Sequence, residues 1–162
     1  MFESIDSNYI KNGVGGLNMV VFELTHIFHY EGSVLFIEPI SLGFFASEQK
    51  IQEAIAYYLT KPGFSENPNA FSVRQRTVEG CIHEPFLYEA MVYIHTEDYE
   101  EECNFELGLF SNIATAQKAV EVYTHNNKHL CLPCNVIVER IINRREINKK
   151  EWIEGFSVSD KR

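Results

Sequence analysis

The segment LGFFAS at residues 42–47 is followed 65 residues later by the similar segment LGLFSN at residues 107–112. The same offset carries further positions of similar chemistry onto one another: Ala54 onto Ala119, Ile55 onto Val120, Tyr58 onto Tyr123, Phe71 onto Val136 and Val73 onto Val138. One offset that holds across several predicted elements indicates an internal repeat. We therefore predict two diverged copies of one small unit.

Upstream of the repeated stretch the match needs a shift of four residues, which aligns His26 with His95 and predicts a longer first loop in the second copy. We therefore expect the chain to have three parts: a flexible leader at residues 1–18, a first unit at 19–80, and a second unit with a C-terminal tail at 81–162. A unit of about 60 residues cannot bury both faces of its own sheet. The two units are therefore expected to cover each other within one compact domain.

The first unit has the pattern strand, strand, helix, strand. Runs rich in β-branched and aromatic residues at 19–30 and 34–45 flank the turn-forming EGS, and another such run is found at 71–78. Ser47 offers an N-cap hydroxyl to a helix whose apolar positions share one face: Ile51, Ala54, Ile55, Tyr58 and Leu59.

The second unit repeats this order. Strands are expected at 87–95, 105–110 and 136–142, and Asn112 is expected to cap the helix between the last two. The pair at 126–127, Asn-Asn, predicts a helix end in the left-handed conformation.

These elements predict an α+β fold, in which two β-β-α-β repeats form a mainly antiparallel sheet of about six strands with both helices packed on one face. Such an arrangement is similar to a ferredoxin-like or fused-dimer-like fold. We also expect the C-terminal tail to dock through three apolar side chains, those of Trp152, Phe156 and Val158.

The composition is that of an ordered, acidic protein, with 13% aromatic residues and a formal net charge of -9. Nucleic-acid binding depends on Lys and Arg that neutralise phosphates, so this charge favours a basic protein partner over a nucleic acid. Acids concentrate in one run that also holds a tyrosine: Glu97, Asp98, Tyr99, Glu100, Glu101 and Glu102. These six residues are the predicted partner-binding site.

The cellular compartment is predicted from the N-terminus and the hydropathy. The first residues carry acids where a signal peptide needs positive charge, and nothing later reaches the roughly 18 consecutive apolar residues of a membrane span. We expect a cytoplasmic protein whose four cysteines are reduced, with no membrane partner.

Four potential zinc ligands stand within ten residues of one another: His125, His129, Cys131 and Cys134. The Cys-x-x-Cys pair is half a zinc signature, and His129 is close enough to Cys131 to crowd a single metal. The alternative is that the thiols are buried or half-buried and the histidines lie in an exposed loop. A redox role would need the first thiol at a helix N-terminus, whereas this pair follows a helix and precedes a strand. We predict no cofactor.

His26, His29 and His95 fall in predicted strands with carboxylates nearby. Such pairs can transfer protons, but no elbow or triad motif places a serine or cysteine nucleophile beside them. A strand histidine bonded to a backbone group or a carboxylate is the commoner outcome. We therefore predict no catalytic residue and no enzymatic activity.

Several motifs resemble an uncharacterised family of small bacterial domains, seen singly or in tandem. The first copy supplies His26, LGFFAS and PGFSENPNAF at residues 62–71; the second supplies His95, YEE at 99–101, LGLFS and a closing WIEGF at 152–156. The copies differ, because the first lacks the W-x-E-G-F ending and the second has CLPC where the P-G-F turn would lie. Tandem acidic domains of this size resemble bacterial immunity proteins, which implies binding to a toxin.

Two functions from different classes remain open. The first is a non-enzymatic acidic binding protein of the immunity type, which neutralises a basic toxin such as a nuclease. The alternative is a small-molecule- or metal-binding regulatory module, because duplicated sheet units often leave a pocket between copies.

Overall fold

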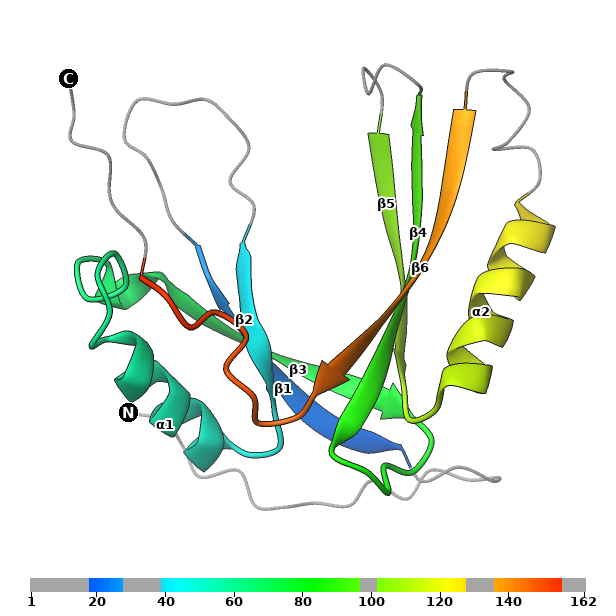
Figure 1. The fold of residues 1–162 in the computed structure, drawn as a ribbon. Helices are drawn as coiled ribbons and strands as arrows, with labels where there is room; N and C mark the ends of the chain where they lie inside the picture. Colours follow the sequence, from blue (N-terminus) through cyan, green and yellow to red (C-terminus); the bar gives the residue numbers. More distant parts are fainter. Residues whose placement is uncertain (1–17, 28–38, 97–101, 128–135, 156–162) are drawn as a thin grey trace.

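A computed structural model describes residues 18–27, 39–96, 102–127 and 136–155. They form an α+β structure with one mixed six-stranded sheet and two α-helices (Figure 1). The elements follow one another as β1 (Met19–His26), β2 (Ile40–Phe45), α1 (Glu48–Tyr58), the 3-10 turn η1 (Pro68–Ala70), β3 (Phe71–Glu79), β4 (Phe86–Thr96), β5 (Glu102–Phe110), α2 (Ile113–Asn126) and β6 (Val136–Glu146). In the described part, no helix is long and apolar enough to span a membrane.

The strand order across the sheet is β2-β1-β3-β5-β4-β6. Antiparallel pairing joins β1 to β2 and β3, and joins β4 to β5 and β6. The two groups of three meet where β3 and β5 pair in parallel over two rungs, Val78 with Leu109 and Glu79 with Phe110. The outermost strands also approach each other, through a parallel bridge between Phe44 and Ile147. The sheet therefore curls until its two ends touch.

Both helices begin at the expected caps. The Ser47 hydroxyl accepts a hydrogen bond from Lys50 N at 3.3 Å, and Asn112 Oδ1 accepts one from Thr115 N at 2.9 Å. The left-handed end expected for the second helix is wrong, because Asn127 has a φ of -113°. Its backbone and side-chain N–H groups both donate to Tyr123 O instead, at 3.0 and 2.9 Å, which terminates α2 without a left-handed residue.

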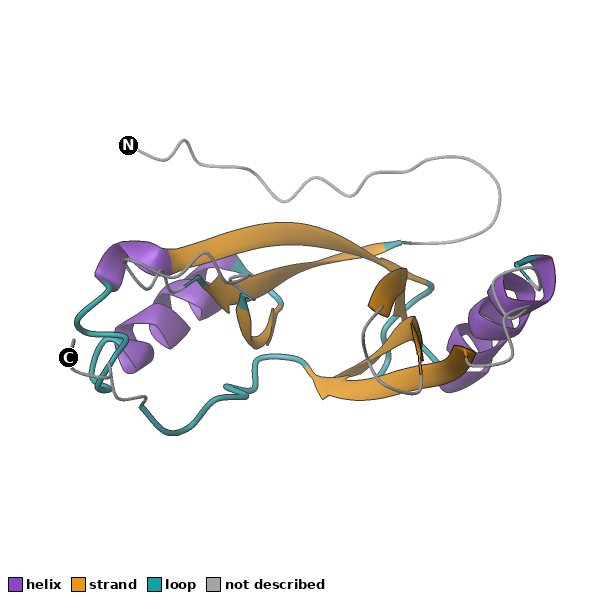
Figure 2. Cartoon of the chain, turned by 90° about the horizontal axis from the view of Figure 1, so that it is seen from above, coloured by secondary structure: helices purple, strands orange, loops and turns teal. Residues whose placement is uncertain are grey.

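The helices cover the outside of the curl, α1 over β1 and β2, and α2 over β4 and β5 (Figure 2). The apolar cluster at α1 consists of Leu24, Leu42, Phe45, Ile51, Ala54, Tyr58 and Phe64. The cluster at α2 consists of Ala90, Val92, Phe110, Ala116 and Val120. Since strand side chains alternate between faces, the neighbouring positions point inward. There Val21, Phe44, Val78, Leu87, Leu109 and Ile147 form a third apolar cluster.

The glycines of the repeated stretches sit at irregularities in the strands. Gly43 has φ +128° and faces Leu24, and Gly108 has φ +137° and faces Ala90. In both hairpins the register shifts at the next rung. A positive φ is open to glycine at little cost, which explains why this residue stands at both positions.

The expected alignment of His26 with His95 is wrong. His26 lies two residues beyond Leu24, which faces Gly43, whereas His95 lies five residues beyond Ala90, which faces Gly108. The histidines therefore occupy different rungs, because β4 extends further past its irregularity than β1 does.

The 65-residue offset also fails in the last strand. Val73 faces Leu24 on β1, but Val138 faces Ile94 on β4. Strand register is set by cross-strand contacts and not by position in the chain, so the sequence offset could not fix it.

Residues 147–155, which we call the C-terminal strap, cross β2 and reach α1. Asn148 N donates to Phe44 O at 2.7 Å, and Glu151 N donates to Leu42 O at 3.1 Å. Trp152, one of the three side chains expected to dock the tail, is 38% exposed. The other two, Phe156 and Val158, lie outside the described residues.

Candidate functional site

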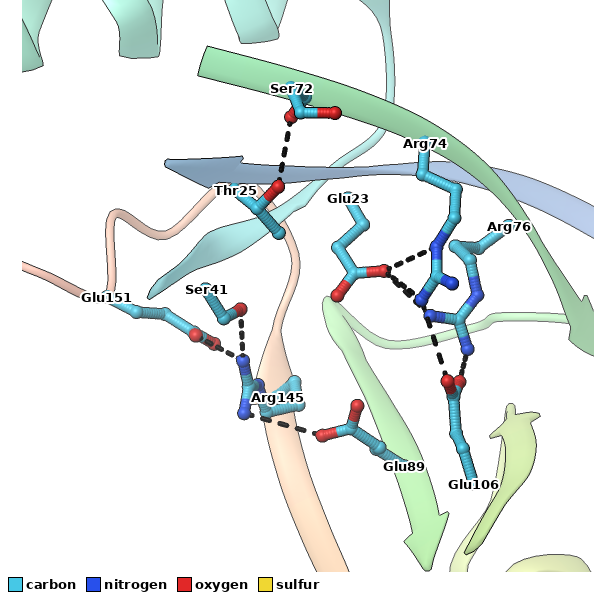
Figure 3. A network of polar contacts seen from close by, with 10 residues as sticks. All are labelled: Glu23, Thr25, Ser41, Ser72, Arg74, Arg76, Glu89, Glu106, Arg145 and Glu151. Carbon is cyan, nitrogen blue, oxygen red and sulfur yellow. Dashed lines mark hydrogen bonds and ion pairs between the residues drawn. The ribbon is translucent and has the colours of Figure 1, made fainter. Parts of the chain in front are cut away.

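Charged side chains gather inside the curl of the sheet (Figure 3). We call them the inner charge network: Glu23 on β1, Arg74 and Arg76 on β3, Glu89 on β4, Glu106 on β5, Arg145 on β6 and Glu151 in the strap. Cross-strand register places them there, because Arg76 faces Val21 of the inner apolar cluster and Arg145 faces Leu87.

One part of the network centres on Glu23. This carboxylate accepts hydrogen bonds from Arg74 at 2.9 Å and from Arg76 at 2.7 Å, and both arginines also pair with Glu106. The side chains of Glu23 and Arg76 are only 11% and 13% exposed. An unpaired charge buried to this extent would be strongly destabilising, so the burial of Glu23 and Arg76 requires their pairing.

The other part centres on Arg145. Its guanidinium donates to Ser41 Oγ at 2.8 Å, to Glu89 at 3.4 Å and to Glu151 at 2.5 Å. Two carboxylates thus share one cation. Burial raises the pKa of Glu151, and the attraction of Arg145 opposes that rise only in part.

The network links elements that share few backbone bonds. Arg76 on β3 reaches Glu106 on β5, beside the join that has only two rungs. Arg145 on β6 reaches Ser41 on β2, beside the single bridge between the ends of the sheet. Because each arginine ties one group of three strands to the other, the arrangement suits a structural role in holding the curl closed.

In the sequence, the acidic run follows β4 and ends with the first residue of β5. Glu97, Asp98, Tyr99, Glu100 and Glu101 lie outside the described residues, and Glu102 is the first residue of β5. Glu102 pairs with His95 near the end of β4. This is the last rung between the two strands.

The two described strand histidines are buried. His26 donates from Nε2 to Asn67 O at 3.2 Å and has the rings of Phe64 and Phe71 edge-on at 4.8 and 4.9 Å. Burial lowers the pKa of His26, against a smaller raising effect of that hydrogen bond.

His95 donates from Nδ1 to Thr96 O at 2.8 Å, and its Nε2 lies 3.4 Å from a carboxylate oxygen of Glu139. The Tyr93 ring stacks on it with a centroid distance of 5.0 Å. His29, the third histidine of the predicted strands, lies outside the described residues.

Of the four candidate zinc ligands only His125 is described. It lies exposed in the last turn of α2, whereas His129, Cys131 and Cys134 fall outside the described ranges. Within those ranges no group of three or more His, Cys, Asp or Glu side chains could hold a metal ion. Cys81 and Cys103 are exposed.

Sequence reasoning missed the inner charge network, although one signal for it was present. Glu23 stands alone in the apolar run MVVFELTH, and Arg74 and Arg76 occupy alternate positions of SVRQRTV. A charge within an apolar strand indicates a buried ion pair, and alternation puts both arginines on one face. The partner of each charge could not be named without the strand order.

No protein-family model, curated protein or solved structure matched the chain. The functional assignment therefore depends on the residues and their geometry.

Proposed function

We propose that the chain is a non-enzymatic acidic binding protein of the immunity type, which docks a basic protein through the acidic run Glu97 to Glu102. The observation that supports this proposal is the pairing of Glu102 with His95, which makes Glu102, the last residue of the run, part of the β4–β5 hairpin. A dense group of acids at a hairpin end is suited to steer and hold a basic partner.

The inner charge network supports the same proposal. Arg74, Arg76 and Arg145 are engaged by carboxylates inside the curl, so these three cations do not offset the acids of the hairpin end. The overall charge of -9 then acts at long range on a partner of opposite sign. A toxin that binds phosphates, such as a nuclease, has the basic surface that this charge would attract, and the acids could occupy its substrate site.

We also propose that the chain arose by duplication of a β-β-α-β unit and that its halves cover each other as in a fused dimer. Similar features recur at equivalent places: the positive φ at Gly43 and Gly108, and the side-chain caps Ser47 and Asn112. These recurrences support two copies of one backbone design.

The contacts between the halves support the duplication as well. The bridge of Phe44 with Ile147 has a counterpart in the rung of Leu109 with Val78, since both are parallel and both start from the repeated stretch. Within the network, Glu89 and Arg145 are arranged much as Glu23 and Arg76 are, each glutamate on the central strand of three and each arginine on its neighbour.

The binding proposal is tested by charge reversal. The variant Glu100→Lys/Glu101→Lys/Glu102→Lys is compared with Glu48→Lys/Glu53→Lys/Glu121→Lys, which makes the same change of net charge at exposed helix positions. The probe is the protein encoded beside this gene, purified and immobilised. We expect the hairpin variant to slow association at least tenfold at low salt and the helix variant to have a much smaller effect. Equal association rates for the two variants would refute the proposed site.

A further inference from the structure

Strand β6 is the last strand of the sheet, so one of its two backbone edges has no neighbour among the described strands. Its other edge pairs with β4 along the whole strand. The outer edge meets β2 only just beyond its end, through the bridge of Ile147 with Phe44. The outer edge of β6 is therefore open along a strand of 11 residues, which is long for an edge strand.

The pairing with β4 decides which backbone groups point to the open edge. Ile147 N donates to Pro85 O, on the β4 side. Because successive residues of a strand direct their N–H and C=O groups to opposite edges, the odd-numbered residues of β6 point to β4 and the even-numbered ones point away from it. Asn148 agrees with this assignment, since its N–H points to Phe44 of β2. The even-numbered residues with no strand beside them in the described part of the chain are Val138, Arg140, Ile142 and Arg144.

The side chains at these positions alternate between apolar and basic. Val138 and Ile142 pack on the cluster at α2, which places the even-numbered side chains on the α2 face of the sheet. Arg140 and Arg144 are exposed, and neither forms an ion pair with a described residue. By contrast, every arginine of the inner charge network is held by carboxylates. The two arginines of the α2 face are therefore available to a partner.

Arg144 is held in position by an aromatic ring. Its guanidinium carbon lies 3.6 Å from the centroid of the Phe86 ring. A guanidinium stacked in this way keeps the N–H groups at its rim available for a carboxylate. Glu146, the remaining charge on this face of β6, pairs with Lys149 at 3.5 Å. The charge left without a partner on this face is thus positive.

We propose that the open edge of β6 binds an extended acidic segment of another protein, which adds an antiparallel strand to the sheet. Backbone hydrogen bonds to the even-numbered residues hold the segment, and antiparallel pairing is the more stable kind. On the α2 face the segment places carboxylates opposite Arg140 and Arg144, and apolar side chains opposite Val138 and Ile142.

A second copy of this chain fits the edge less well. Pairing β6 with β6 would bring Arg140 and Arg144 of both molecules onto one face with no carboxylate opposite them, and like charges across a sheet are destabilising. An acidic segment is therefore the favoured occupant. The inference does not use the acidic run and stands independently of the proposed function.

Binding of a synthetic peptide to the full chain tests the proposal. The peptide is Thr-Glu-Thr-Val-Thr-Glu-Thr-Val-Thr with blocked ends, in which Glu and Val alternate on one face of a strand. N-methylation at its Glu and Val residues removes the N–H groups that bind β6, whereas N-methylation at its Thr residues removes those that point away. We expect the first change to weaken binding about tenfold and the second to have little effect. Equal or reversed effects would refute the antiparallel strand.

Amide hydrogen exchange shows where the peptide binds. With the peptide at saturation, the amides of Arg140 and Ile142 should exchange more slowly, while those of Glu139 and Ile141, which face β4, should not change. Protection that does not alternate along β6 would overturn the proposal. Alternating protection that is already present without peptide and rises with protein concentration would overturn it as well, because a second copy would then occupy the edge.

Charge reversal tests the two arginines. Arg140→Glu/Arg144→Glu is compared with Lys50→Glu/Lys118→Glu, which makes the same change of net charge at exposed helix positions. We expect the β6 variant to bind the peptide about tenfold more weakly than wild type, and the helix variant to bind it almost as well. A peptide with Lys in place of Glu should instead prefer the β6 variant. Equal binding of the acidic peptide by both variants would contradict the pairing with Arg140 and Arg144.

Discussion

Arg76 on β3 and Glu106 on β5 form an ion pair beside the point where these two strands share only two rungs. The same guanidinium also binds Glu23 on β1 at 2.7 Å. One side chain therefore connects three strands, two from the first group and one from the second. Where backbone bonds are few, such a contact contributes a large share of the cohesion between the groups.

Arg76→Ala tests this contribution. It leaves Glu23 with the more exposed Arg74 as its remaining partner and weakens the hold on Glu106. We expect a loss of roughly 2–3 kcal/mol in the free energy of unfolding, below the cost of breaking a fully buried pair because Glu106 is partly exposed. Urea denaturation measures it. Lys50→Ala, which removes an exposed pair with Glu53 on α1, should leave the urea midpoint unchanged; a similar midpoint for both variants would contradict the structural role.

Gly43→Ala and Gly108→Ala form a second test. Both place a side chain at a positive φ, which costs about 1–3 kcal/mol. At Gly43 the new Cβ would also collide with the backbone oxygen of Lys149, whereas at Gly108 the nearest atoms would be those of the Phe110 ring at 3.6 Å. Thermal unfolding should therefore show a larger loss for Gly43→Ala. Equal losses would mean that the strap does not press on β2.

Tyr58 predicts a loss of stability in alkaline solution. Burial raises the pKa of Tyr58 from 10.0 to about 12. Because the unfolded chain then loses the phenolic proton first, the stabilising contribution is complete below pH 10 and disappears as the pH rises toward 12. Urea midpoints measured across this range should fall less steeply for Tyr58→Phe than for wild type. If the urea midpoints of wild type and Tyr58→Phe fell in parallel with rising pH, the raised pKa of Tyr58 would be contradicted.

Tyr58→Phe also removes a hydrogen bond at neutral pH. The Leu42 carbonyl loses the donor at 3.0 Å, although it keeps Glu151 N. We expect the free energy of unfolding to fall by about 1 kcal/mol. Tyr57→Phe is the matched control, since the Tyr57 hydroxyl makes a longer, exposed bond to Ile153 O.

His26 predicts a change on the acid side. Its lowered pKa means that the folded state resists protonation of this ring. The stabilising contribution is therefore present above the ordinary value of 6.5 and is lost as the pH falls through the folded pKa. An NMR titration of the ring protons should give a midpoint below 6.5 for His26. A midpoint at or above that value would contradict its burial among Phe64 and Phe71.

Local signals in the sequence predicted the secondary structure well. Ser47 and Asn112 begin their helices as expected, because a cap depends only on the residues of one helical turn. The apolar positions of α1 also point inward as predicted for Ile51, Ala54 and Tyr58, while Leu59 does not, since the helix ends before it.

Non-local features were harder to predict. The parallel pairing of β3 with β5, the rung of His95 and the path of the strap all depend on strands far apart in the chain. Hydrophobic periodicity assigns a residue to a face but not to a partner. For the same reason the pairing of Glu23 with Arg74 and Arg76 could not be predicted without the strand order.

The contact of β2 with the C-terminal strap, which includes the bridge of Phe44 with Ile147, affects the solubility of the protein. An unpaired strand edge can form backbone hydrogen bonds with the same edge of another molecule, and such pairing is a common first step of aggregation. Here the outward carbonyls of Leu42 and Phe44 are already occupied by the chain's own strap. Removing residues from 148 onward would thus turn β2 into a template for intermolecular strand pairing.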